Sequence, residues 1–280
     1  MKTAPIEEAI LERLENGEAL VLATILSQAG STPRTAGTRM IIRQDGSILG
    51  TIGGGLVEAE SIRAAAQVFA DGKSQTLDFD LSNQDLTNTM DLICGGKTRV
   101  CVEMIRPDQA TIQDYRRQAR SIKAARTRLY LFGAGHVARQ TALLAALVDF
   151  RVTVLDDRKE FANPERFPDA EEVRVLESFE TAMQDLPIPA GSFLLILTRG
   201  HSHDRTVLAQ ALQTEAGYIG MIGSRNKRNT IYSSLLAEGF SQKDLDRVFC
   251  PVGLEIQAES PSEIGISIVA QLIQQRAALK

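Results

Sequence analysis

Two glycine-rich segments of this 280-residue chain are of the kind that brings backbone N–H groups against a phosphate. The first contains Gly53, Gly54 and Gly55 and runs directly into an apolar stretch with helical periodicity. The second contains Gly133 and Gly135 and follows a short apolar run. A helix N-terminus with no side chains in front of it is an anion site. Two such turns in separate halves of the chain predict a phosphate-bearing ligand held between two domains.

The second glycine turn matches a nucleotide-binding pattern. Gly133-Ala-Gly135-His-Val-Ala138 has the form GxGxxA, with a predicted strand before it and a predicted helix after it. Asp156 ends the next predicted strand about 20 residues later, where an acid would bind a ribose hydroxyl. The pattern predicts a Rossmann-like fold. Two interpretations of the turn stay open: it holds a dinucleotide, or its glycines only allow a helix and a strand to pack closely.

All three histidines of the chain follow predicted parallel strands of this second half. His136 lies in the glycine turn, and His201 and His203 follow the apolar run FLLILT. In the doubly wound strand order 3-2-1-4-5 these two strands are neighbours, so both loops emerge at the switch point where ligands bind. Ser224 and Arg225 follow the next predicted strand and are expected at the same rim, together with Lys227.

This rim has the residue types for contact with a polyanionic ligand or for proton transfer. His201 is the candidate for proton transfer. A mononuclear metal site and a plain solvated loop are the alternatives for the histidines, and no metal ligand is assigned. The expected ligand contacts of this half are Gly133, Gly135, His136, Asp156, Arg199, Asp204, Ser224 and Arg225.

The first half carries further candidates around its own glycine turn. The segment GSTPRTAGTRM contains Ser31 and Arg34, which could clamp a phosphate or a pterin, or could simply form an exposed turn before a hairpin. We expect ligand contacts from these two residues and from the turn Gly53–Gly55. Glu58 is either a favourable charge in the first turn of a helix or another ligand contact.

Cys94 is the candidate reactive thiol of the first half. Two glycines follow it, which favours an accessible thiolate among backbone N–H groups, whereas the alternative is a small buried apolar residue. The chain has three cysteines and no CxxC spacing, so neither a disulfide framework nor a zinc site is indicated. This usage fits a reducing compartment, the cytoplasm.

The elements that must position these residues fall into two groups. An α+β half is predicted first, and it is followed by a polar, basic segment with helical periodicity. After residue 128 short apolar runs alternate with helical patterns, including a helix at 178–185 and a final helix that starts at Pro261 with Ser260 as its cap. The fold class is therefore α/β, an N-terminal α+β domain followed by a doubly wound parallel sheet. The predicted divisions are an N-terminal domain 1–106, a linker helix 107–127 and a Rossmann-like domain 128–280.

In the α+β half we expect hydrophobic runs and turn signals to give two helices and five strands. The predicted helices are 5–16 and 56–70, and the predicted strands are 19–27, 39–43, 47–52, 75–80 and 97–105.

Composition excludes several classes of protein. The chain has 31 Lys and Arg against 35 Asp and Glu, a formal charge of −4, which argues against a nucleic-acid binder. The charged, helical N-terminus is unlike a signal peptide, and no apolar run approaches the roughly 20 residues that span a bilayer. We expect a soluble cytoplasmic protein without a membrane span.

Several motifs occur together in a fixed order. They are GSTPRTAGTRM, GTIGGGLVE, CGG, GAGHVA, LDDR, TRGHSHD, YIGMIGSRNK and PVGL with SPSEIGISIVA. In this order they resemble the xanthine dehydrogenase accessory factor family (XdhC/CoxI) over residues 19–272. The chain departs from the family pattern near its C-terminus, at Gln257, Ser260, Gly265 and Gln271, which affects the shape of that edge of the crevice and the identity of the client enzyme.

The resemblance implies a role in the maturation of molybdenum hydroxylases. It implies binding of the molybdenum cofactor (molybdopterin), support for replacing an oxo ligand by sulfur with a cysteine desulfurase, and insertion into an apo xanthine-dehydrogenase-type hydroxylase. It also implies a homodimer. Molybdopterin carries a phosphate and a dithiolene, which agrees with the N–H groups and cations predicted above, and Cys94 would suit a transient soft ligand to molybdenum or sulfur.

Three functions compete at this point. The first is a cofactor chaperone that binds, protects and hands over its cargo without turnover. The second is an NAD(P)-dependent oxidoreductase that uses the Rossmann-like domain, with His136 or His201 as acid and base. The third is a nucleotide-sensing regulatory module. The motifs of the first half favour the chaperone, because a simple dehydrogenase has no need of them.

Overall fold

The computed structural model describes residues 6–30, 32, 34–81 and 96–279. Two compact units make up the chain, residues 1–124 and 125–280. Ser31 and Cys94, two of the predicted site residues, lie outside the described residues.

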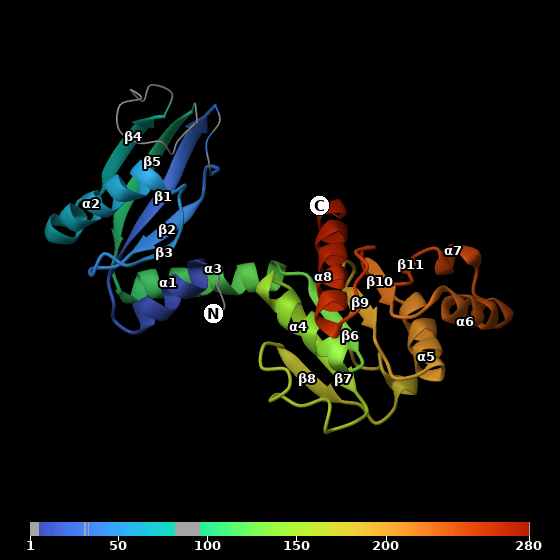
Figure 1. Cartoon of the computed structure of the whole chain (residues 1–280). Helices are drawn as coiled ribbons and strands as arrows, with labels where there is room; N and C mark the ends of the chain where they lie inside the picture. Colours follow the sequence, from blue (N-terminus) through green and yellow to red (C-terminus); the bar gives the residue numbers. More distant parts are fainter. Residues whose placement is uncertain (1–5, 31, 33, 82–95, 280) are drawn as a thin grey trace. The chain divides into compact units, whose positions relative to one another are not determined.

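The first unit is built on a five-stranded antiparallel sheet in the order β3-β2-β1-β5-β4 (Figure 1). The predicted hairpin is confirmed, since Ile42 pairs with Ile48 across a tight turn. The strands are β1 (Leu20–Ala29), β2 (Arg39–Ile42), β3 (Ile48–Gly50), β4 (Gln75–Asp80) and β5 (Lys97–Ile105), and the helices are α1 (Ile6–Glu15), α2 (Gly55–Asp71) and α3 (Gln109–Ala125).

Helices cover both faces of this sheet. Side chains of β1 alternate between the faces, as expected for a strand buried on both sides. Val21 and Ala23 belong to the core that contains the apolar side of α2, whereas Leu20 and Leu22 pack with α1 and with Tyr115 of α3. The sheet is therefore the middle layer of three.

The second unit has a six-stranded parallel sheet in the order β11-β10-β9-β6-β7-β8. This is the predicted doubly wound order, and it places β6 beside β9 at the switch point. The strands are β6 (Arg128–Phe132), β7 (Arg151–Asp156), β8 (Glu172–Val175), β9 (Phe193–Ile196), β10 (Tyr218–Met221) and β11 (Val248–Phe249).

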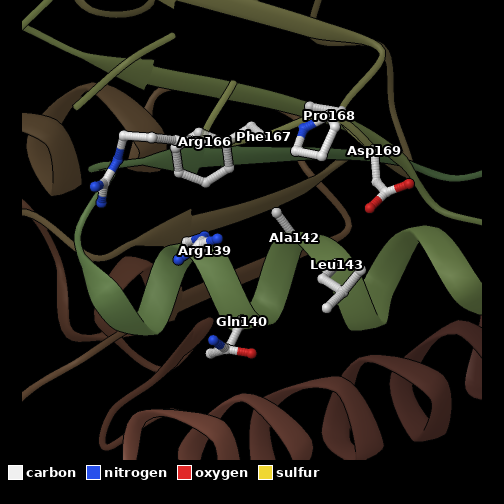
Figure 2. Close-up of a pocket in the computed structure, with 9 residues that line it drawn as sticks. Arg139, Gln140, Ala142, Leu143, Arg166, Phe167, Pro168 and Asp169 are labelled. Atoms are coloured by element: carbon white, nitrogen blue, oxygen red, sulfur yellow. The ribbon is translucent and has the colours of Figure 1, made fainter. Parts of the chain in front are cut away.

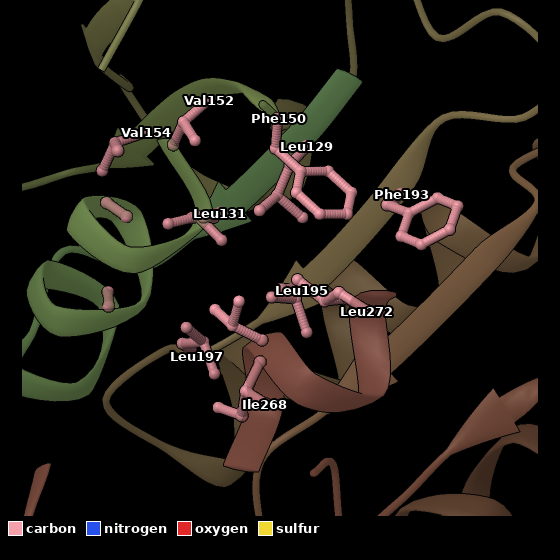
Figure 3. Packing of buried hydrophobic residues seen from close by; sticks show 14 of the residues in the cluster. Leu129, Leu131, Phe150, Val152, Val154, Phe193, Leu195, Leu197, Ile268 and Leu272 are labelled. Carbon is pink, nitrogen blue, oxygen red and sulfur yellow. The ribbon is translucent and has the colours of Figure 1, made fainter. Parts of the chain in front are cut away.

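Two apolar cores lie on opposite faces of the parallel sheet. On one face α4 (His136–Leu147) and α8 (Pro261–Ala278) pack against alternate side chains of β6, β7 and β9, and Figure 3 shows Ile268 and Leu272 of α8 against Leu195. The other core contains side chains of α5 (His201–Leu212), α6 (Arg225–Ala237) and α7 (Gln242–Leu245).

One predicted helix of the second unit is wrong. Instead of a helix at 178–185 the chain forms a single 3-10 turn, η1 (Phe179–Thr181). Asp185 has a φ of 61°, outside the helical region, and Pro187 follows two residues later, which disfavours a helix before it. The final helix is confirmed: Ser260 accepts from the Glu263 N–H, the Glu263 carboxylate accepts from the Ser260 N–H, and Pro261 is the first helical residue.

Among the helices of the described residues, none combines the length and the apolar character needed to cross a membrane.

Candidate functional site

In the first unit, the described residues that flank Ser31 and Cys94 lie at one end of the antiparallel sheet. Ala29, the last residue of β1, is in register with Lys97 of β5, and Lys97 is in register with Asp80 of β4. The Leu81 N–H donates to the Gly96 carbonyl at 2.8 Å, which joins the two residues that bound the segment of Cys94. The loop of Arg34 therefore begins at the same end of the sheet at which the segment of Cys94 begins and ends.

An open cavity of about 460 Å³ lies at this end of the sheet, formed by residues of β1, β4 and β5. Its volume is within the range of sites that take ligands of drug size. The Arg34 side chain is exposed and has no carboxylate partner among the described residues, so its guanidinium is available to an anion.

The glycine turn of the first unit follows β3. Gly50 at the end of β3 pairs with Met40, which pairs with Ala23 in the middle of β1. The three glycines of the turn all have positive φ, at 127°, 75° and 55°. Only glycine adopts such conformations readily, so the backbone itself requires the residues Gly53–Gly55.

Glu58 stabilises this turn by accepting hydrogen bonds from it. One of its carboxylate oxygens accepts from the Thr51 hydroxyl, the Ile52 N–H at 3.1 Å and the Gly54 N–H at 2.8 Å. Burial raises the pKa of Glu58, but the hydrogen bonds from Thr51, Gly54 and Ile52 together outweigh it and hold the pKa below its usual value. Glu58 is thus a carboxylate that the turn binds.

This arrangement changes how the first turn could hold a phosphate. The N–H groups of Ile52 and Gly54 donate hydrogen bonds to Glu58, and the N–H of Gly53 donates to the Thr51 hydroxyl oxygen at 3.2 Å. An N–H cradle made of these groups, as expected from the sequence, is already occupied. A ligand contact at Gly53–Gly55 stays a prediction that depends on the N–H groups of the first turn of α2.

In the second unit, the two glycines of the GxGxxA turn have different structural roles. Gly133 has a φ of 116°, and a Cβ there would stand 2.2 Å from the Leu197 carbonyl oxygen, so the fold demands glycine. Gly135 has a φ of −72°, which any residue adopts, and no atom of the described residues lies within 4 Å of a Cβ added to it. The packing of the protein therefore gives no reason for glycine at position 135.

Gly200 repeats the features of Gly135 on the neighbouring strand. Its φ is −167°, and a Cβ there would also meet no atom within 4 Å in the part of the chain that the structure describes. Gly135 is the N-cap of α4 and Gly200 is the N-cap of α5, and neither helix has a side-chain cap. By contrast, Ser224 caps α6 by accepting from the Lys227 N–H at 3.2 Å. Because β6 and β9 are adjacent, two uncapped helix N-termini follow neighbouring strands at the switch point.

Asp156 ends β7 as expected, but its carboxylate is bound by groups of the protein itself. Its side chain is 1% exposed, and it accepts from the Ala134 N–H at 2.8 Å and from the Arg158 guanidinium at 2.8 and 2.9 Å. Burial raises the pKa of Asp156, but the hydrogen bonds from Arg158 and Ala134 outweigh burial and lower it. The acid therefore holds the glycine turn in place, and its oxygens are already engaged.

Arg199 joins the same network. It forms a two-pronged pair with Asp157, with one contact at 2.8 Å, and its guanidinium reaches 4.0 Å from Asp156. Sequence reasoning did not single out Arg158, although it belongs to the motif LDDR directly after Asp156.

The predicted rim residues divide into exposed and buried groups. His136 and His201 are exposed in the first turns of α4 and α5, as is Arg225 at the start of α6. His203 instead packs against Phe179, with ring centroids 5.0 Å apart and the ring planes tilted by 45°. Asp204 is completely buried, against the expectation that it faces the crevice.

Asp204 is buried because it has two internal partners. It accepts from the Thr198 hydroxyl at 2.6 Å and forms an ion pair with Lys227, whose ammonium also donates to the Ile222 carbonyl at 3.2 Å. Lys227 was expected as a free cation at the rim, but its side chain is only 14% exposed. Within the described ranges, no group of three or more His, Cys, Asp or Glu side chains is placed to hold a metal ion.

Two family models match the chain, each within one of the two units. Residues 129–272, just over half of the chain, match the XdhC Rossmann domain, and residues 13–80 match the XdhC and CoxI family.

Individual relatives agree with these matches. The chain is 34% identical to Escherichia coli (strain K12) YqeB over 96% of its own length, although it spans only 45% of that protein. It is 26% identical to a Bacillus subtilis (strain 168) protein named as a probable subunit of xanthine dehydrogenase, covering 94% of this chain and 95% of that one. The E. coli (strain K12) molybdenum cofactor insertion chaperone PaoD is 22% identical, over 95% of this chain and 86% of PaoD.

A solved structure extends the similarity to the fold of nearly the whole chain. The crystal structure of a protein described as a xanthine dehydrogenase from Bacillus halodurans matches with a TM-score of 0.82 and 26% identity, over 98% of this chain and 96% of that one. From the ordered motifs, the two units and these matches together, the chain belongs to the XdhC and CoxI family.

Proposed function

We propose that this protein is a maturation factor for a xanthine-dehydrogenase-type molybdenum hydroxylase: it binds the molybdenum cofactor, supports its sulfuration and inserts it into the apo enzyme. The cofactor is cargo in this scheme. The protein acts as a chaperone, and no small substrate is turned over.

The observation that carries the proposal is a pair of helices at the switch point whose N-cap residue is glycine, so that neither has a side-chain cap. Gly135 and Gly200 leave the N-termini of α4 and α5 without side chains in front of them, although the fold would accept a larger residue at either position. Free N–H groups and the positive ends of two helices suit a phosphate such as that of molybdopterin. His136 and His201 stand in the first turns of the same helices and can donate hydrogen bonds to that anion.

The first unit supports the same function through different chemistry. Its exposed Arg34 suits an anionic or pterin group, and the cavity at that end of the sheet has the volume of a ligand site. Cys94, which lies outside the described residues, keeps its proposed role as a transient thiolate ligand of molybdenum or sulfur.

The proposal includes partners and a location. A cysteine desulfurase supplies the sulfur, an apo molybdenum hydroxylase receives the cofactor, and the protein works as a homodimer. We place it in the cytoplasm, in keeping with Cys101 and Cys250, which are free thiols.

The competing function, an NAD(P)-dependent oxidoreductase, finds less support in this Rossmann-like unit. An acid at the end of the second strand usually binds the ribose hydroxyls of NAD. Here that acid, Asp156, is 1% exposed and saturated by Ala134 and Arg158.

The two functions are separated by a retention experiment. The purified chain is incubated with the molybdenum cofactor and, separately, with NAD and NADP, then desalted, and bound molybdenum, pterin and nucleotide are measured. We expect retention of the cofactor without retention of nucleotide. Retention of NAD or NADP without pterin would favour the oxidoreductase.

A further inference from the structure

The flank of α4 carries a cavity lined by two arginines, one of which, Arg166, also reaches the turn before α4. A cavity of about 150 Å³ lies between α4 and the loop that connects β7 to β8. Figure 2 shows its two walls: Arg139 and Leu143 project from α4, and Arg166, Pro168 and Asp169 come from the loop.

Arg166 is the least satisfied charged group in this cavity. Its Nε is buried and has no hydrogen-bond partner, and no carboxylate among the described residues pairs with its guanidinium. Its one hydrogen bond from the guanidinium, to the Ala134 carbonyl, is long at 3.5 Å. A buried N–H of a guanidinium without an acceptor is costly, so Arg166 gains stability from an anion that contacts the rest of its guanidinium.

Arg166 shares an aromatic ring with a second arginine, Arg158. Its guanidinium lies 4.9 Å from the centre of the Phe161 ring, and that of Arg158 lies 3.8 Å from the same centre. Arg158 is neutralised by Asp156, whereas Arg166 is not. An anion bound to Arg166 would reduce the repulsion between the two guanidiniums beside the Phe161 ring.

Arg139 provides the second cation, from the facing wall. It is exposed on α4 and has no acidic partner in the part of the chain that the structure describes. The only carboxylate in the lining is Asp169, which Figure 2 places over Leu143, farther along α4 than Arg139. Two guanidiniums against one carboxylate leave the cavity with a net positive charge.

The size of the cavity limits the ligand. At about 30 Å³ for each water molecule, 150 Å³ corresponds to about five waters, which is enough for a tetrahedral oxyanion. Pockets that bury a drug-sized ligand start at about 300 Å³. We propose that Arg139 and Arg166 bind a phosphate-sized oxyanion in this cavity, either free phosphate or the phosphate group of a larger molecule whose remainder extends into solvent.

The test is a calorimetric titration of the full chain, in buffer free of phosphate, with inorganic phosphate and with glycerol phosphate as a monoester. Chloride serves as the control for ionic strength. Binding of inorganic phosphate alone identifies the free ion as the ligand, and equal or tighter binding of the monoester identifies a phosphorylated molecule.

A matched pair of variants locates the site. Leu143 and Leu147 are both on α4 with exposures of 43% and 45%, but only Leu143 lines the cavity. Leu143→Glu places a negative charge at the cavity and should weaken phosphate binding by about tenfold or more, whereas Leu147→Glu should change it by less than about twofold. Arg139→Gln should also weaken it by about tenfold.

These variants also distinguish the cavity from the helix N-termini as the place of binding. If phosphate binds at Gly135 and Gly200 instead, Leu143→Glu and Leu147→Glu will affect it equally and Arg139→Gln will have little effect. That pattern, or the absence of saturable binding of either ligand at millimolar concentration, would overturn the proposal. Thermal unfolding of each variant checks that the fold is retained.

Discussion

The α-carbon of Gly133 lies against the carbonyl oxygen of Leu197, so that a Cβ at position 133 would stand 2.2 Å from that oxygen. This contact joins the turn after β6 to the end of β9 and brings the starts of α4 and α5 together. A hydrogen bond of 2.7 Å from the Gly133 N–H to the Leu155 carbonyl fixes the same turn to β7. The turn is thus held by its neighbours on both sides.

Gly133→Ala should destabilise the second unit by about 3 kcal/mol or more, because the added methyl group meets backbone atoms and the φ of 116° is unfavourable for alanine. The measurement is urea unfolding of the full chain. Gly135→Ala is the control within the same turn and should change the free energy of unfolding by no more than about 0.5 kcal/mol. Equal losses in the two variants would contradict this assignment of roles.

Gly135→Ala should have a functional effect in place of a structural one. If the cofactor phosphate approaches the N-terminus of α4, a methyl group at Gly135 obstructs it while the fold is unchanged. We expect cofactor affinity to fall by about tenfold, which corresponds to about 1.4 kcal/mol. The retained molybdenum and pterin are measured after desalting. Unchanged retention in Gly135→Ala and in Gly200→Ala would remove these positions from the site.

The buried pair of Asp204 and Lys227 should be structural. Asp204→Asn leaves the Lys227 ammonium uncompensated in the interior, so the free energy of unfolding should fall by about 3 kcal/mol. The double variant Asp204→Asn with Lys227→Met should lose less than the single variant, because no charge is then left unpaired. Arg205→Gln, which breaks an exposed pair with Glu238, is the control and should cost less than about 1 kcal/mol. Urea unfolding measures all three.

Glu58 should stabilise the first unit in a pH-dependent way. Its pKa in the folded protein is lower than in the unfolded chain, so its contribution is complete above the unfolded value of about 4.3 and is lost as the pH falls through the lower folded value. The advantage of wild type over Glu58→Gln in urea unfolding, about 1 kcal/mol at pH 7, should therefore shrink below about pH 4. Glu60→Gln, which affects only an exposed pair with Arg63, should show no such loss. A constant difference between wild type and Glu58→Gln across this range would show that the carboxylate charge is not involved.

In the second unit the sequence predicted the layers and the strand order, because those depend on local patterns. Short apolar strands alternate with amphipathic helices after residue 128, and that alternation leads to a parallel sheet of known handedness. The capped start of α8 is equally local, since Ser260, Pro261 and Glu263 lie within four residues.

The roles of individual site residues depended on contacts that a sequence does not display. Gly133 and Gly135 look alike in the motif, and only the approach of Leu197 separates them. In the sequence Asp204 looks like an exposed acid beside two histidines, but in the structure it is buried in an ion pair with Lys227 from another helix. Asp156 fits the position of a ribose ligand, yet its partners are the turn and Arg158.

The most direct test of the proposed function is transfer of the cofactor to an apo molybdenum hydroxylase. The purified chain is loaded with molybdenum cofactor, freed of excess by desalting and mixed with the apo enzyme, and hydroxylase activity is followed with and without a cysteine desulfurase and its sulfur source. We predict that the loaded chain activates the apo enzyme, that the desulfurase increases this activation, and that Gly135→Ala reduces it. Two results would contradict the account. One is that the chain retains no pterin after incubation with the cofactor and desalting. The other is that the loaded chain leaves the apo enzyme inactive although free cofactor activates it.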